Sequence, residues 1–180
     1  MDGLRQGVIS CQGFGYTTGN TMTFQYEREL ERLKEIARKA IIKTTFRPAD
    51  KDSLEYLVSE EYPPEIINFH QFAEPDISLD HGNATLLPVR SLKEENQQAV
   101  PSCIVYPFGY RAIAATYYGN VFCVDINRST GHHYGSIYYV NHDEAYEDMG
   151  KETVDSILVK TADNFRGFLK LFCEGKLGKR

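Results

Sequence analysis

The chain has 180 residues, of which 42% are hydrophobic and 25% are charged, and this composition is typical of a soluble globular protein. The length suits one domain with a sizeable core, and the net charge of −5 argues against nucleic acid as the main partner. The sequence has no apolar run long enough to span a membrane and no basic-then-apolar signal peptide pattern at its N-terminus. We therefore expect a cytoplasmic protein that does not bind membranes.

The N-terminal part predicts an arm followed by a long helix. Residues 1–20 are rich in Gly, Ser and Thr, which is typical of a flexible or loosely packed segment, and we expect the folded domain to cover 21–180. The helix should run to about Lys43, with charged side chains on its solvent faces. Its apolar residues recur at helical spacing at Leu30, Leu33, Ala37, Ala40 and Ile41.

Two short helices are predicted next. Pro48 ends the long helix, and Asp52 or Ser53 can cap a short helix after it. A further helix, Glu65–Ala73, follows two prolines, which suit the first turn of a helix.

Beyond residue 80 the apolar residues recur with the spacing of β-strands instead of that of helices. The predicted strands are Ala84–Val89, Ile104–Phe108, Arg111–Tyr117, Asn120–Ile126 and Tyr134–Val140, with a helix from Ser91 to Gln98 after the first of them. Thr153–Lys160 fits either a helix or a strand, and Asp163 can cap a final helix that carries Phe165, Phe168, Leu169 and Phe172. Helices, then an antiparallel sheet, then a helix is the order of an α+β fold.

Asn120–Ile126 and Tyr134–Val140 form the clearest local pattern, an antiparallel hairpin. Both runs are rich in β-branched and aromatic residues, and the residues between them are turn formers. Apolar side chains occupy both alternating sets of the first run, so both faces should be covered and the hairpin should lie centrally in the sheet. We interpret the hairpin as scaffold.

The motifs that suggest chemistry are weak. Gly13, Gly15 and Gly19 lack the preceding strand and the following Lys-Ser/Thr of a phosphate-binding loop. His132 and His133 lie in a predicted turn and should point different ways, and His142 stands at the far end of the following strand, so the three do not favour a metal site. The four cysteines form no CxxC pair, which favours reduced thiols. We predict no catalytic residue, no cofactor and no metal.

The charge layout is more informative. Eight acids lie between Asp52 and Asp80, and no Lys or Arg occurs between Lys51 and Arg90. A second acidic run extends from Asp143 to Asp155, with Lys151 as its one base. Acidic faces can steer basic protein partners. The residues predicted to contact a partner are Glu55, Glu60, Glu61, Asp143, Glu144 and Glu147.

Four segments follow one another in an informative order. They are Leu54-Glu-Tyr-Leu with Tyr62-Pro-Pro-Glu-Ile-Ile-Asn-Phe69; Leu86-Leu-Pro-Val with Leu92; Tyr106-Pro-Phe-Gly109 through Gly119-Asn-Val-Phe-Cys-Val-Asp125 to Gly135-Ser-Ile-Tyr-Tyr-Val-Asn-His-Asp143; and Thr161-Ala-Asp-Asn-Phe165-Arg-Gly-Phe168-Leu169. In this order they resemble the SUKH superfamily, which includes the yeast cell-wall-assembly (glucan-synthesis) regulator and many bacterial immunity proteins. Together they cover about residues 50–175. The double proline replaces the usual Leu-Pro, and the family's frequent Trp residues are absent.

The resemblance implies an α+β domain around a curved antiparallel sheet, with an extra N-terminal helix in this chain. It also implies a non-enzymatic protein-binding module, and first of all an immunity protein that neutralises a basic toxin, often a nuclease. The alternatives are a regulatory scaffold like the yeast relative and, from another class, a small-molecule- or metal-binding enzyme. The oligomeric state stays open.

Overall fold

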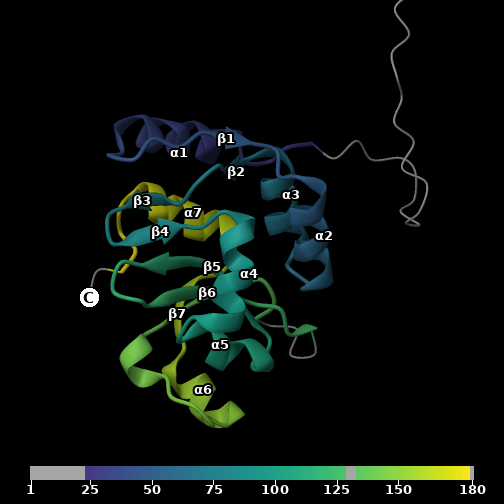
Figure 1. Ribbon diagram of the computed structural model, residues 1–180, viewed down its shortest axis with the longest axis vertical. Coiled ribbons are helices and arrows are strands. Elements are labelled where there is room, and N and C mark those ends of the chain that lie inside the picture. The colour runs from purple at the N-terminus through teal and green to yellow at the C-terminus, as the bar shows by residue number, and fades with distance from the viewer. Residues whose placement is uncertain (1–22, 129–132, 179–180) are drawn as a thin grey trace, which may run out of the picture.

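The computed structural model describes residues 23–128 and 133–178, and Figure 1 shows the arrangement. The predicted arm, residues 1–20, lies outside the described residues. The helices are α1 (Glu27–Lys39), α2 (Lys51–Ser59), α3 (Pro64–Phe72), α4 (Val89–Gln98), α5 (Ser102–Val105), η1 (Tyr106–Phe108), η3 (His142–Glu144), α6 (Lys151–Ile157) and α7 (Phe165–Cys173). The strands are β1 (Phe46–Arg47), β2 (Glu74–Pro75), β3 (Leu79–His81), β4 (Ala84–Leu86), β5 (Tyr110–Thr116), β6 (Val121–Asp125), β7 (Ile137–Val140) and β8 (Val159–Ala162).

Strands β3 to β8 form one sheet in chain order, and each strand is antiparallel to the next. β1 and β2 form a separate two-stranded sheet. The predicted α+β class is confirmed. The register between β5 and β6 shifts at Ile113, which is a β-bulge, and such a bulge bends the strand that carries it.

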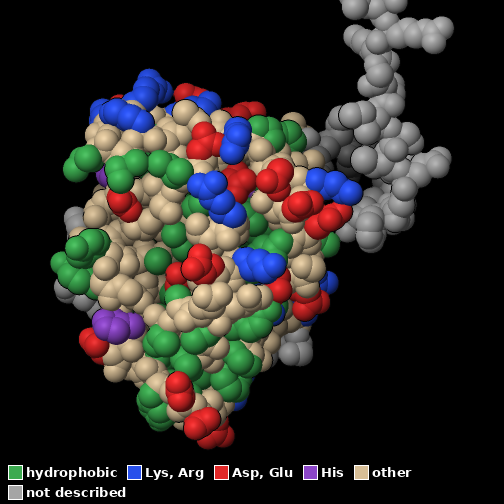
Figure 2. All heavy atoms as spheres, viewed as in Figure 1, with side chains coloured by type: hydrophobic (Ala, Val, Ile, Leu, Met, Phe, Trp, Pro, Cys, Tyr) green, Lys and Arg blue, Asp and Glu red, His purple; other side chains and the backbone are tan. Residues whose placement is uncertain are grey.

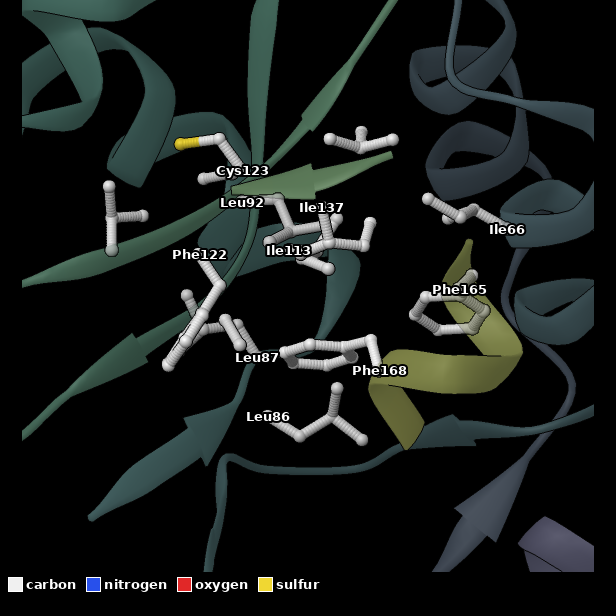
Figure 3. Close-up of a cluster of buried hydrophobic side chains, with 14 of the residues drawn as sticks. Ile66, Leu86, Leu87, Leu92, Ile113, Phe122, Cys123, Ile137, Phe165 and Phe168 are labelled. Carbon is white, nitrogen blue, oxygen red and sulfur yellow. The ribbon is translucent and has the colours of Figure 1, made fainter. Parts of the chain in front are cut away.

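The prediction that β6 is central and covered on both faces is confirmed. β6 pairs with β5 and β7, and all five of its residues are buried. Phe122 faces α7, where its ring centroid lies 5.5 Å from that of Phe168. Cys123 points away from Phe168, and α4 and α5 contact the neighbouring strand β5. Figure 3 shows this cluster of buried side chains.

α7 supplies much of the core. Its four predicted apolar residues, Phe165, Phe168, Leu169 and Phe172, are fully buried. Phe165 also meets Phe69 of α3 and Tyr26 before α1 at centroid distances of 5.3 and 6.0 Å. Aromatic packing therefore joins the first, third and last helices on one side of the sheet.

The predicted strand Ile104–Phe108 is wrong, because this segment is helical. It forms the end of α5 and the 3-10 turn η1, and Gly109, with φ +86°, ends it. A short apolar run does not distinguish a strand from a buried helix. Pro101 and Pro107 stand at the starts of these two turns, where a missing N–H is tolerated.

Several predicted boundaries also differ. α1 ends at Lys39 rather than Lys43, so Ile41 is fully exposed instead of extending the apolar stripe. Val89 begins α4 rather than ending a strand, and the last predicted strand begins at Ile137 rather than Tyr134. The ambiguous segment Thr153–Lys160 contains the junction between α6 and β8, so each alternative holds for one part of it.

The residues that cap two helices are neighbours of the predicted ones. Asp50 Oδ1 accepts from the Ser53 backbone at 2.8 Å at the start of α2, and Asn164 Oδ1 accepts from Gly167 N at 2.9 Å in α7. Asp163 instead pairs with Lys160. Asp, Asn and Ser are all favoured at N-caps, so the sequence offers more than one candidate near the start of each helix.

Candidate functional site

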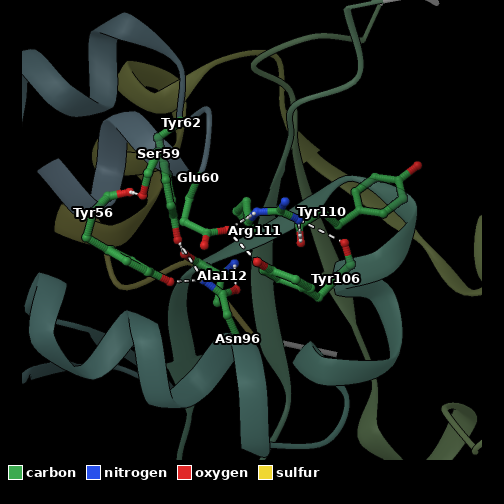
Figure 4. Close-up of polar contacts among 9 residues, drawn as sticks. All are labelled: Tyr56, Ser59, Glu60, Tyr62, Asn96, Tyr106, Tyr110, Arg111 and Ala112. Carbon is green, nitrogen blue, oxygen red and sulfur yellow. Dashed lines mark hydrogen bonds and ion pairs between the residues drawn. The ribbon is translucent and has the colours of Figure 1, made fainter.

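Glu60, one of the predicted contact residues, is engaged inside the molecule. Its Oε2 lies 3.0 Å from Arg111 Nε and accepts from the Tyr106 hydroxyl at 2.6 Å. The two charged side chains are 17% and 12% exposed, and the guanidinium carbon of Arg111 lies 3.8 Å from the ring centroid of Tyr106. The hydrogen bond to Glu60 raises the pKa of the Tyr106 hydroxyl. Figure 4 shows this cluster between α2 and β5.

Replacing Glu60 with glutamine is therefore expected to reduce stability by about 1 kcal/mol, because a charge-assisted contact becomes a neutral one. Urea unfolding of Glu60→Gln and of the exposed neighbour Glu61→Gln measures the difference, and Glu61→Gln should be close to neutral. Equal stability of the two variants would contradict a structural role for Glu60. For the same reason Glu60→Lys, which places two cations together, is unsuitable for testing partner binding.

Other acids of the 52–80 run also bind the chain itself. Glu65 Oε1 accepts from Phe165 N at 3.0 Å, at the first residue of α7. Glu74 Oε1 accepts from Val89 N at 2.6 Å, at the first residue of α4. Both carboxylates satisfy helix N-terminal amides that have no intrahelical acceptor. Asp76 pairs with Arg47, and Asp80 accepts from Thr85. Counting Glu60 and the exposed pair of Glu55 with Lys51, six of the eight acids thus have intramolecular partners.

The other predicted contact residues are exposed. Glu55 makes an exposed pair with Lys51 at 3.4 Å, and Asp143 lies 3.0 Å from His142 Nε2. Glu61, Glu144 and Glu147 are exposed and form no ion pair within 4.0 Å with a Lys or Arg of the described residues.

The six predicted residues do not form one surface. Glu55, Glu60 and Glu61 belong to α2 and its C-terminal end, whereas the other three lie in or after η3. In Figure 1 α2 lies to the right of the sheet, and α6, which follows the η3 segment, lies at the bottom.

Two adjoining grooves lie where β5 begins and β6 ends. The larger, of about 650 Å³, is lined by Tyr106, Phe108, Arg111, Arg128 and Lys151 among others, and the smaller, of about 320 Å³, by Tyr110, Asp125, His133, Tyr138 and Asp155 among others. Arg111 is paired with Glu60, and Lys151 Nζ lies 2.5 Å from Asp155 Oδ1. Arg111, Lys151 and Asp155 are thus paired within the chain, whereas Glu61 and Arg128, which also line the larger groove, form no ion pair among the described residues.

The histidine and cysteine residues give no metal arrangement among the described residues, where no three His, Cys, Asp or Glu side chains converge. His132 lies outside the described residues, His133 is exposed, and His142 contacts Asn120 and Asp143. Cys103, Cys123 and Cys173 are free thiols, and burial raises the pKa of the Cys123 thiol. None of the described helices is long and apolar enough to cross a membrane.

The fold defines a single α+β domain built on a six-stranded antiparallel meander, with helices on both of its faces. The chain belongs to the SMI1 / KNR4 family (SUKH-1), whose family model matches residues 54–171. This range agrees with the resemblance over about residues 50–175. No curated protein and no solved structure matches the chain.

Proposed function

We propose that the chain is a non-enzymatic protein-binding module, and specifically an immunity protein that neutralises a basic toxin by direct binding. The observation that carries the proposal is that three of the predicted contact residues, Glu61, Glu144 and Glu147, are exposed carboxylates with no Lys or Arg within 4.0 Å among the described residues. Exposed acids that are not engaged in the fold remain available to a basic surface, where they increase the association rate and select the partner. Membership of the SMI1 / KNR4 family supports the same class of function.

Co-purification tests the proposal. The tagged full chain is expressed in its native host, and we expect it to recover one basic protein at about a one-to-one ratio. Expression of that protein alone should stop growth, and co-expression of the chain should restore growth. Recovery of signalling or cell-wall enzymes without growth inhibition would replace the immunity proposal with the regulatory alternative.

A charge-reversed variant sharpens this test. Glu61→Lys, Glu144→Lys and Glu147→Lys together should abolish recovery and growth rescue, because they reverse charges that the fold does not use. The matched control carries Glu27→Lys, Glu31→Lys and Glu94→Lys, which change the net charge equally at other exposed positions. If the control loses the partner to the same extent, net charge and not these residues determines binding.

A further inference from the structure

The turn between β5 and β6 exposes two adjacent aromatic side chains. Tyr117 is 90% exposed and Tyr118 is 68% exposed. Their ring centroids lie 5.6 Å apart at an interplanar angle of 86°. In Figure 2 hydrophobic side chains protrude at the left edge of the molecule, where Figure 1 places this turn. Aromatic residues normally bury most of their area, and exposed ones grouped together mark interaction sites.

The turn is held in place by hydrogen bonds. Thr116 N donates to Asn120 O at 2.8 Å, and Gly119 N donates to Thr116 O at 3.1 Å. Gly119 has φ +82°, a left-handed conformation that a side chain would strain. The buried side chain of Asn120 accepts from His142 N at 3.0 Å, which joins the turn to η3. A fixed turn presents its side chains with little ordering cost on binding.

Acidic side chains follow this link along the chain. Asp143 and Glu144 follow His142 within η3, and both are exposed. Tyr146, 60% exposed, and Glu147 continue the same segment. The sequence has no Lys or Arg in 112–127 or in 133–150. The turn and the η3 segment therefore combine aromatic rings with negative charge.

The molecule itself contains an arginine that is bound by both a tyrosine ring and a carboxylate. The guanidinium of Arg111 lies over the ring of Tyr106 while its Nε contacts the carboxylate of Glu60. A guanidinium can stack on an aromatic ring and bond a carboxylate at the same time, whereas an ammonium acts as a point charge. An exposed pair of tyrosines on a turn that is joined to a segment of exposed carboxylates thus offers arginines of another protein the same two kinds of contact.

We propose that Tyr117, Tyr118, Asp143 and Glu144, here called the tyrosine–acid surface, bind an arginine-rich segment of a basic protein. This inference rests on the proposed function, which supplies a basic partner. It also places the main contact at the second acidic run, whose carboxylates stay exposed; in the 52–80 run most acids are engaged in the fold, and Glu61 is exposed without an ion pair among the described residues.

A peptide titration followed by nuclear magnetic resonance tests the surface directly. The ¹⁵N-labelled full chain is titrated with a ten-residue peptide of alternating glycine and arginine. We expect amide shift changes to concentrate in residues 116–120 and 142–148. Tyr117→Ser with Tyr118→Ser should raise the Kd about tenfold, since two stacking contacts are lost, and Tyr117→Phe with Tyr118→Phe should leave it nearly unchanged. The same peptide with lysine should bind more weakly than the arginine peptide.

The matched control is Ile41→Ser with Ile42→Ser, which removes an exposed apolar pair elsewhere and should not change the Kd. The proposal that this surface binds the peptide would be contradicted by native-like binding of the tyrosine-to-serine variant. Shift changes spread evenly over the other acidic segments would also contradict it. The two proposals fail separately. A recovered toxin with no peptide effect at the turn refutes only the surface, whereas peptide binding with no recovered toxin refutes only the immunity function.

Discussion

Replacing Asn96 with leucine is expected to lower the free energy of unfolding by about 3 kcal/mol, because a buried backbone amide loses its acceptor. Asn96 Oδ1 accepts from Ala112 N at 2.8 Å, and its Nδ2 donates to the hydroxyls of Tyr56 and Tyr62 at 3.0 Å each. The Tyr62 hydroxyl donates in turn to Ala112 O at 2.8 Å. These side chains are shown in Figure 4.

The position of this network explains the size of the effect. β4 pairs with β5 only from Ala114 to Thr116, and Ala112 lies beyond that pairing, directly before the bulge at Ile113. Side chains of α4 and of the segment after α2 therefore take the place of a neighbouring strand. A buried backbone group without a partner costs about 1–3 kcal/mol, and the loss of the tyrosine contacts adds to it.

Urea unfolding measures the change, with Gln97→Leu as the matched control. Gln97 is exposed on the same helix, so the same kind of amide-to-leucine change there should stay within about 0.5 kcal/mol of the native chain. Tyr62→Phe should cost less in the Asn96→Leu background than in the native one, because the two side chains belong to one network. Additive costs would mean that they act independently.

Much of the fold follows from apolar spacing. The apolar stripe of α7 was predicted because its apolar residues recur at helical spacing. The buried strand β6 was predicted because apolar residues occupy both of its alternating sets. β3 was not predicted, since it has only three residues, of which one is buried. The bulge at Ile113 was also missed, because the register of two strands depends on contacts across the sheet rather than on either strand alone.

The charge pattern predicted an acidic protein but not which acids reach its surface. Glu65 bonds a residue 100 positions away in the chain, and Glu74 bonds one 15 positions away; nothing near either residue indicates these contacts. The tyrosine–acid surface had a local signal, two tyrosines before Gly119. Tyr117 was predicted to end a strand, and the sequence gives no sign of the hydrogen bond from His142 to Asn120 that joins the turn to the acidic segment.

Acidification from pH 7 to pH 5 is expected to reduce stability by about 2 kcal/mol through His70 alone. His70 is buried in α3, and its Nδ1 has no hydrogen-bond partner among the described residues. Burial lowers the pKa of His70 from 6.5 to about 4. Above pH 6.5 the side chain is neutral in both states. As the pH falls from 6.5 toward 4, the unfolded chain binds a proton that the folded chain does not, so unfolding becomes more favourable.

Urea unfolding at pH 7 and at pH 5 of the native chain, His70→Leu and His133→Gln checks this dependence. The loss of stability should shrink by about 2 kcal/mol in His70→Leu and stay native-like in His133→Gln, because His133 is exposed. Glu74 acts in the opposite direction, since burial raises its pKa and its protonation favours the folded state. An unchanged pH dependence in His70→Leu would show that the imidazole is solvated or partnered in solution, and that α3 packs less tightly there than the burial of Ile66, Phe69 and His70 implies.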